Sequence, residues 1–145
     1  YAWQNLILSI SSTYAEEGDF VKVAEEGIHE LYGYDIGPVL FKPTQAVEEP
    51  FRGTAEGALS YFVGAENLPP GVGIPEDKGF AIAGGDTWSK VRFDNDQIYC
   101  VTDYLAFAEG YYYFTNAKTN VTTGVEYSFG YEKLEDGKLK IILHH

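Results

Sequence analysis

The residues best suited to acid–base chemistry are two glutamates in the last third of the chain. Glu109 and Glu126 each stand in the middle of an otherwise apolar, strand-like run. A carboxylate that is buried where a sheet meets helices has a raised pKa and could act as a general base. The alternative is that each glutamate reaches solvent or pairs with Arg92 or Arg52. If the first case holds, one of the two is the catalytic acid or base.

A histidine pair at the end of the sequence offers a third candidate. His144 and His145 are adjacent on the last expected strand, so their side chains point to opposite faces and do not readily bind one metal ion together. No motif with metal-ligand spacing accompanies them, and we predict neither a metal site nor a cofactor. We expect His144 to face a pocket and assist the glutamate. A hydrogen-bonded histidine near a subunit contact and a remnant of a purification tag are the alternatives.

One arginine and five aromatic residues are candidates for binding a ligand. Arg52 follows Phe51 directly, and its planar guanidinium could bind a carboxylate ligand or pair with one of the 22 acidic residues of the chain. The aromatic candidates form either a pocket wall or plain core; they are Tyr32, Phe41, Tyr61, Trp88 and Tyr111.

Helices in the first half of the chain and strands in the second must position these residues. Apolar residues recur at helical spacing from Trp3 to Tyr14 and from Phe20 to Leu31, with Asp19 placed to cap the second helix. Thr54 can cap a short third helix. Strand-like runs separated by turn formers occupy 39–42, 88–93, 97–101, 104–115, 121–131 and 138–145. This order predicts a single α+β domain over residues 1–145.

The strand at 104–115 carries aromatic residues on both faces, so both faces must be covered. Helices would cover one face. A second copy of the chain, forming a homodimer or higher homo-oligomer, would cover the other, unless the long loop at 64–85 folds back over it.

Composition excludes several classes of partner. The net charge is −12, which disfavours binding to nucleic acid or to an anionic membrane surface. The 12 tyrosines and 9 phenylalanines supply enough apolar surface for a folded core.

A single cysteine, Cys100, allows no internal disulfide, and we expect it in the core. The chain begins with Tyr1 and contains no methionine, so residues could precede it, and the compartment stays open between cytoplasm and export.

Five short strings spread over nearly the whole chain resemble the nuclear-transport-factor-2-like superfamily, also called cystatin-like or SnoaL-like. The closest similarity is to the association domain of calcium/calmodulin-dependent kinase II. The strings are Glu30–Tyr34, Gly37–Thr44, Phe51–Thr54, Ala58–Gly64 and Gly137–His145. The resemblance implies N-terminal helices packed on a strongly curved antiparallel sheet, with a pocket between them. Members include isomerases, dehydratases, cyclases, ligand binders and oligomerisation domains, so the fold does not decide the function.

These observations lead to two hypotheses. The first is a pocket protein that binds a small, mostly apolar ligand, with an acid–base isomerase, dehydratase or hydrolase as its enzymatic version. The second is a non-catalytic oligomerisation or association domain. A pocket of roughly several hundred cubic ångströms would favour the first hypothesis, and a filled pocket beside a large apolar interface would favour the second.

Overall fold

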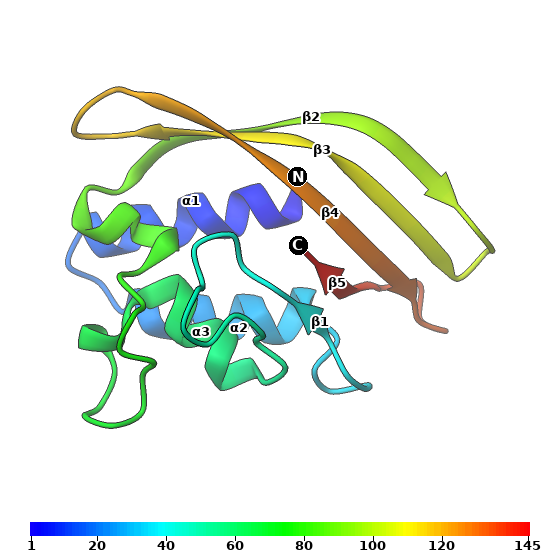
Figure 1. Ribbon diagram of the computed structural model, residues 1–145, viewed down its shortest axis with the longest axis horizontal. Helices are drawn as coiled ribbons and strands as arrows, with labels where there is room; N and C mark the ends of the chain where they lie inside the picture. Colours follow the sequence, from blue (N-terminus) through cyan, green and yellow to red (C-terminus); the bar gives the residue numbers. More distant parts are fainter.

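Three helices pack on one face of a curved five-stranded sheet (Figure 1). The computed structural model describes all 145 residues. As expected, the first 32 residues are mainly two helices, and the third begins after Thr54. The side chains of Asp19 and Thr54 accept hydrogen bonds from the backbone N–H groups of Lys22 and Gly57, which caps the second and third helices. The helices are α1 (Ala2–Ala15), α2 (Phe20–Leu31) and α3 (Ala55–Val63).

The strands follow the order β1-β5-β4-β3-β2 across the sheet. All neighbours are antiparallel except β1 and β5, which are parallel. The two strands expected at 88–93 and 97–101 are one continuous strand with a register shift between Asn95 and Gln97. A side chain at the facing Gly110 would collide with the Asp94 carbonyl, so this irregular pairing needs glycine there. The strands are β1 (Leu40–Phe41), β2 (Trp88–Cys100), β3 (Leu105–Asn116), β4 (Thr122–Lys133) and β5 (Leu139–His144).

Aromatic rings fill the space between the helices and the sheet. The inner face of the sheet, which meets the helices, carries Tyr112 and Phe114 of β3 and Tyr127 and Phe129 of β4. Trp3 of α1 is buried among them and stacks on Tyr112, with ring centroids 5.2 Å apart. The core therefore sits where α1 crosses the middle of the sheet.

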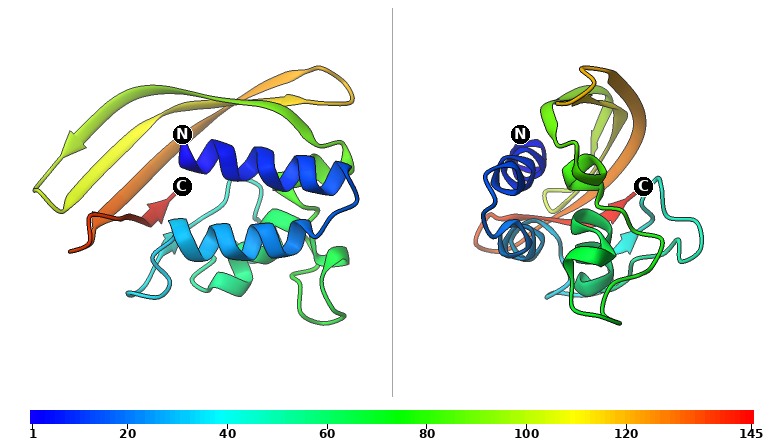
Figure 2. Two further views of the ribbon diagram at one scale, coloured as in Figure 1. Left: turned by 180° about the vertical axis from the view of Figure 1, so that it is seen from behind. Right: turned by 90° about the vertical axis from the view of Figure 1, so that its left-hand side faces the viewer.

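The far ends of β2, β3 and β4 extend beyond the helices (Figures 1 and 2). Cys100 lies in this extension and is exposed, so the expectation that it belongs to the core is wrong. The alternation of side chains along this strand does not indicate that the helices end before they reach Cys100.

The segment 64–85, expected as a long loop, contains the short helices η1 (Ala65–Asn67) and η2 (Phe80–Gly85). It contacts α1 and α3 and lies on the helical side of the molecule (Figure 1). It therefore does not cover the outer face of the sheet, which is the face turned away from the helices. No helix has the length and apolar character that crossing a membrane requires.

Candidate functional site

A small cavity lies between the N-terminal end of α1, the segment after β1, α3 and the inner face of the sheet. Its volume is about 40 Å³. A water molecule needs about 10–15 Å³ measured in this way, so the cavity has room for about three water-sized groups. Its lining is mostly aromatic, with a few polar atoms, and comprises Trp3, Phe41, Pro43, Thr44, Gln45, Tyr61, Phe62, Phe80, Tyr112, Val125 and His144.

The His144 ring is the most constrained polar group in this lining. It stacks between Phe129 and Phe41, with centroid distances of 4.1 Å and 4.8 Å. Burial, together with the neighbouring His145, lowers the pKa of His144 to about 3, so the imidazole is neutral near pH 7. His144 thus lies in the lining of a cavity, where the sequence led us to expect it.

Both ring nitrogens of His144 are hydrogen-bonded to tyrosine hydroxyls. Nδ1 lies 2.8 Å from the Tyr32 hydroxyl, and Nε2 lies 3.2 Å from the Tyr112 hydroxyl. Trp3 Nε1, which can only donate, lies 3.0 Å from the same Tyr32 oxygen.

The indole donor determines the direction of the whole chain of hydrogen bonds. Tyr32 is fully buried and accepts from Trp3, so its own proton has His144 Nδ1 as its partner. A neutral imidazole that accepts at Nδ1 carries its proton at Nε2 and therefore donates to the Tyr112 oxygen. The hydroxyl proton of Tyr112 is then free to point into the cavity. Burial raises the pKa of both tyrosines, which keeps both hydroxyls protonated.

Two further hydroxyl-bearing residues line the cavity. The Tyr61 ring stacks on Phe80 at 5.5 Å, and its hydroxyl accepts a hydrogen bond of 3.4 Å from the backbone N–H of Gln45. Thr44 precedes Gln45 on the segment that follows β1. Thr44, Tyr61 and Tyr112 together supply hydroxyl groups inside aromatic walls, an arrangement that can bind a very small molecule through its oxygen atoms.

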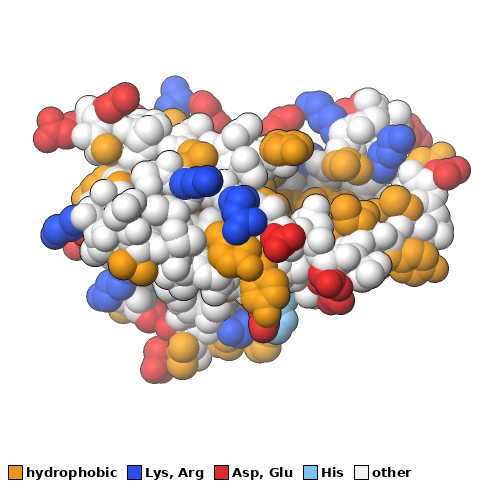
Figure 3. Space-filling model, turned by 90° about the horizontal axis from the view of Figure 1, so that it is seen from above, with side chains coloured by type: hydrophobic (Ala, Val, Ile, Leu, Met, Phe, Trp, Pro, Cys, Tyr) orange, Lys and Arg blue, Asp and Glu red, His pale blue; other side chains and the backbone are white.

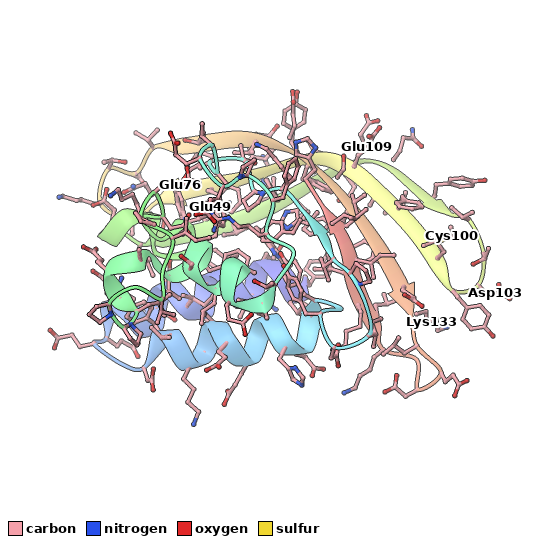
Figure 4. All side chains as sticks on the ribbon, turned by 60° about the horizontal axis from the view of Figure 1, so that its bottom comes forward. Glu49, Glu76, Cys100, Asp103, Glu109 and Lys133 are labelled. Carbon is pink, nitrogen blue, oxygen red and sulfur yellow. The ribbon has the colours of Figure 1, made fainter.

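Glu109 and Glu126 lie away from this cavity. Both side chains are exposed on the outer face of the sheet, and both border a broad hollow that also includes Lys42, Thr44 and His145. Figure 4 labels Glu109 on the sheet, and Figure 3 shows that acidic and hydrophobic side chains share the surface seen from above. The expectation that one of them is buried against the helices is wrong. In β3 the residues that meet the helices are Tyr112 and Phe114, so Glu109, at an odd position, faces outward. The alternative that these glutamates reach solvent is the observed one.

Arg52 is buried but is fully occupied by protein groups. Its NH1 and NH2 atoms lie 2.7 Å and 2.8 Å from the two carboxylate oxygens of Asp77, and its Nε donates to the Glu49 carbonyl. NH1 also donates to the Gly57 carbonyl. NH2 also lies 3.4 Å from Glu76 Oε1. The guanidinium therefore makes ion pairs with acidic residues, the second of the two alternatives, and its five N–H donors all have protein partners.

The aromatic candidates divide into three groups. Phe41 and Tyr61 line the cavity, and Tyr32 reaches it through His144. Trp88 packs against Phe80 and Phe114 outside the cavity. Tyr111 is exposed on the outer face. Of the two alternatives, plain core therefore describes Trp88, and neither describes Tyr111.

Four residues that line the cavity were not predicted from the sequence; they are Trp3, Thr44, Gln45 and Tyr112. Tyr112 could have been chosen over Tyr111 only with knowledge of which face meets the helices. Thr44 and Gln45 lie in a segment without periodicity, and nothing in their spacing indicates that they approach β3. No three His, Cys, Asp or Glu side chains gather where they could hold a metal ion.

Sequence and structure comparisons identify close relatives over the whole chain. A family model described as metal-independent carbonic anhydrase matches residues 1–145. A protein of that description from Nostoc sp. (strain PCC 7120 / SAG 25.82 / UTEX 2576) is 40% identical over 147 residues, covering 99% of this chain and 67% of the relative. The crystal structure of an iota-carbonic anhydrase from a cyanobacterium, complexed with bicarbonate, is similar with a TM-score of 0.87 and 39% identity. That alignment covers 99% of this chain and 84% of the cyanobacterial one.

More distant structures confirm the resemblance seen in the sequence. A putative calcium/calmodulin dependent protein kinase II association domain from Xanthomonas campestris matches with a TM-score of 0.57 and 25% identity, over 99% of this chain and 77% of the other. An NTF-2 like protein of unknown function from Shewanella oneidensis MR-1 shares the fold as well, with a TM-score of 0.51 and 13% identity over 99% of this chain and 94% of the other. The match to the family model over all residues, together with the 40% identity, shows that this chain belongs to the metal-independent carbonic anhydrase family.

Proposed function

We propose that this protein catalyses the reversible hydration of carbon dioxide to bicarbonate in the cavity around His144. The observation that carries the proposal is the volume of about 40 Å³ behind aromatic walls. Pockets for ordinary metabolites measure about 300–1,000 Å³, so a substrate of that size does not fit, whereas a molecule of three or four heavy atoms does. The family and the bicarbonate complex of the cyanobacterial relative support the same substrate.

This proposal replaces the isomerase, dehydratase or hydrolase expected from the sequence. Those activities were assigned to Glu109 or Glu126, which are exposed outside the cavity. The cavity of about 40 Å³ is much smaller than the several hundred cubic ångströms expected of a pocket protein. The coarser expectation of a small, mostly apolar ligand still agrees with carbon dioxide, which has no net dipole and suits an aromatic cavity.

The cavity stabilises the charge that develops during the reaction. When water attacks the carbon atom, a new C–O bond forms, one C=O bond becomes a C–O⁻ bond, and the water loses a proton to solvent or buffer. The inward-pointing hydroxyl of Tyr112 donates to the developing negative oxygen, and the hydroxyl-bearing residues Thr44 and Tyr61 line the same cavity. Because aromatic rings surround the site, a hydrogen-bond donor acts there more strongly than it would in water.

His144 acts in this mechanism as a positioning residue. Its pKa of about 3 makes it a weak base, and its Nδ1 already accepts the Tyr32 proton. Its contribution is to donate from Nε2 to Tyr112, which aims the Tyr112 proton at the substrate.

The test is stopped-flow hydration of carbon dioxide, followed with a pH indicator, on protein treated with a chelator and freed of metal. We expect acceleration over buffer, a loss of about a hundredfold in kcat for Tyr112→Phe, and normal activity for Tyr111→Phe. The two variants remove the same hydroxyl from adjacent residues, one facing the cavity and one facing outward. Equal activity of the two variants, or no acceleration by the wild type, would refute the assignment.

We also propose that two copies of the chain associate through the outer face of the sheet. Phe107, Tyr99 and Tyr111 are 38%, 66% and 45% exposed on that face. Covering such surface is favourable by about 25 cal/mol per Å². Association of this kind is compatible with the hydration activity and keeps the expectation of a homo-oligomer.

A further inference from the structure

The segment that brings Thr44 to the cavity has no regular secondary structure between residues 43 and 51, and we call it the site loop. Its two ends are fixed to the sheet. The N–H of Lys42 donates to the His144 carbonyl at 2.9 Å, and the N–H of Arg52 donates to the Phe41 carbonyl at 2.7 Å. The middle of the loop has no strand partner and must be held by side chains.

One carboxylate holds the middle of the site loop. The oxygens of Glu76 accept hydrogen bonds from the backbone N–H groups of Val47, Glu48 and Glu49 at 2.9, 3.0 and 2.8 Å (Figure 4). These three donors lower the pKa of Glu76 to about 2, so the carboxylate stays charged at any ordinary pH. Three consecutive amides on one charged acceptor fix the backbone more firmly than neutral hydrogen bonds would.

The neighbouring Asp77 joins this anchor to the wall of the cavity. It pairs with Arg52 and accepts a hydrogen bond of 2.6 Å from Ser60 of α3. Tyr61, the next residue of α3, lines the cavity, and the Arg52 guanidinium carbon lies 5.8 Å from the centre of its ring. Glu76 and Asp77 therefore connect the site loop to the helix that carries Tyr61.

We propose that Glu76 is a positioning residue, which holds the site loop so that Thr44 and Gln45 close the cavity beside Tyr61. The proposal rests on the hydration activity proposed above for its effect on catalysis. Glu76 lines no part of the cavity and does not touch the substrate; it binds three amides located three to five residues after Thr44 and lies 3.4 Å from NH2 of Arg52, at the end of the site loop.

The variant Glu76→Gln tests this role with little change in size. An amide side chain has one acceptor oxygen, and its NH₂ group would face an N–H donor of the loop, so part of the anchor is lost. We expect hydrogen exchange at the amides of Val47, Glu48 and Glu49, measured by NMR, to accelerate by about tenfold or more. We expect kcat for hydration to fall by a similar factor, with the fold retained by circular dichroism. Glu66→Gln is the matched control, because Glu66 is exposed and its side chain makes no hydrogen bond or ion pair.

The results separate this proposal from the proposed function. If the three amides exchange as slowly in Glu76→Gln as in Glu66→Gln, the anchor does not exist. If they exchange faster while kcat is unchanged, the anchor exists but does not position the site. If the wild type lacks hydration activity, the proposed function is wrong, and amide exchange still decides whether Glu76 holds the loop. Should Glu76→Gln not fold, Glu76→Asp keeps the charge but withdraws the oxygens by one methylene, and it should show the same two effects.

Discussion

Acidification should destabilise this protein through His144 before most carboxylates are protonated. The folded pKa of His144 is about 3, whereas an unperturbed histidine in the unfolded chain has a pKa of about 6.5. Because the folded pKa is the lower one, the unfolded chain binds more protons between these values. The stability that depends on neutral His144 is therefore fully present above about pH 6.5 and is lost as pH falls towards about 3.

The size of this effect follows from the two pKa values. Their difference predicts a loss of about 2 kcal/mol in the free energy of unfolding between pH 7 and pH 5, and about 3 kcal/mol by pH 4. His144 is only 4% exposed, so little solvent screening reduces these values. Since domains are stable by about 5–15 kcal/mol, the loss is large enough to measure.

The assay is urea unfolding at pH 7, 6 and 5 for the wild type and for His144→Phe. A phenylalanine can occupy the place between Phe41 and Phe129 but cannot titrate. It leaves the Tyr32 hydroxyl without its acceptor, which should cost about 1–3 kcal/mol at every pH. The variant should therefore be less stable at pH 7 but lose less stability on going to pH 5. His29→Gln, at an exposed position on α2, should behave as the wild type. Equal losses for wild type and His144→Phe between pH 7 and pH 5 would refute the view that burial holds this imidazole neutral.

Three further predictions concern the hydrogen-bond chain, the site loop and the outer face. Tyr32→Phe removes the hydroxyl proton that His144 Nδ1 accepts, so the Tyr112 hydroxyl loses its fixed orientation. Stopped-flow assays should then show kcat falling by about tenfold with a smaller change in KM. An unchanged kcat would mean that this chain of hydrogen bonds does not aim the Tyr112 proton. Because its folded pKa is lowered to about 2, the stability that depends on Glu76 is present above its unfolded pKa of about 4.3 and is lost between about pH 4.5 and 2. Acid titration of Glu76→Gln should therefore be flatter than that of the wild type in this range, and coincident curves would contradict the lowered pKa. Phe107→Glu places a charge on the outer face of the sheet and should prevent association. Sedimentation should show a dimeric wild type and a monomeric variant of about 16.1 kDa. A monomeric wild type would overturn the proposed association.

Local pattern predicted the elements but not the site, because the site depends on which faces meet. The helical spacing from Trp3 to Tyr14 and the caps at Asp19 and Thr54 are local features, and the structure reproduces them. In β3 both Tyr111 and Tyr112 are aromatic, so alternation alone could not say which face is buried. That ambiguity leaves the position of Glu109 open and gives no reason to choose Tyr112 over Tyr111.

The loops were beyond reach for a different reason. Arg52 finds its partner Asp77 across 25 residues of sequence, and Glu76 binds amides more than 25 residues before it. Neither contact has a spacing rule, since both join segments without periodicity. The sequence could indicate that Arg52 pairs either with a ligand or with an acidic residue. Only the packing of α3 against the site loop decides between the two.

The aromatic content of the chain, which at first reads as ordinary core, determines what the cavity can accept. A fold with helices laid over a curved sheet leaves room between the layers, and bulky rings fill almost all of it here. Trp3 fills part of this room, because its indole packs against the rings of Phe93, Tyr112 and Phe129. The same indole donates to Tyr32 and so sets the direction of the hydrogen bonds that end at Tyr112. The Trp3 side chain thus helps to keep the cavity small and also orients the Tyr112 hydroxyl that would bind the substrate. Both the size of the cavity and the direction of this donor therefore depend on the packing of α1 against the sheet.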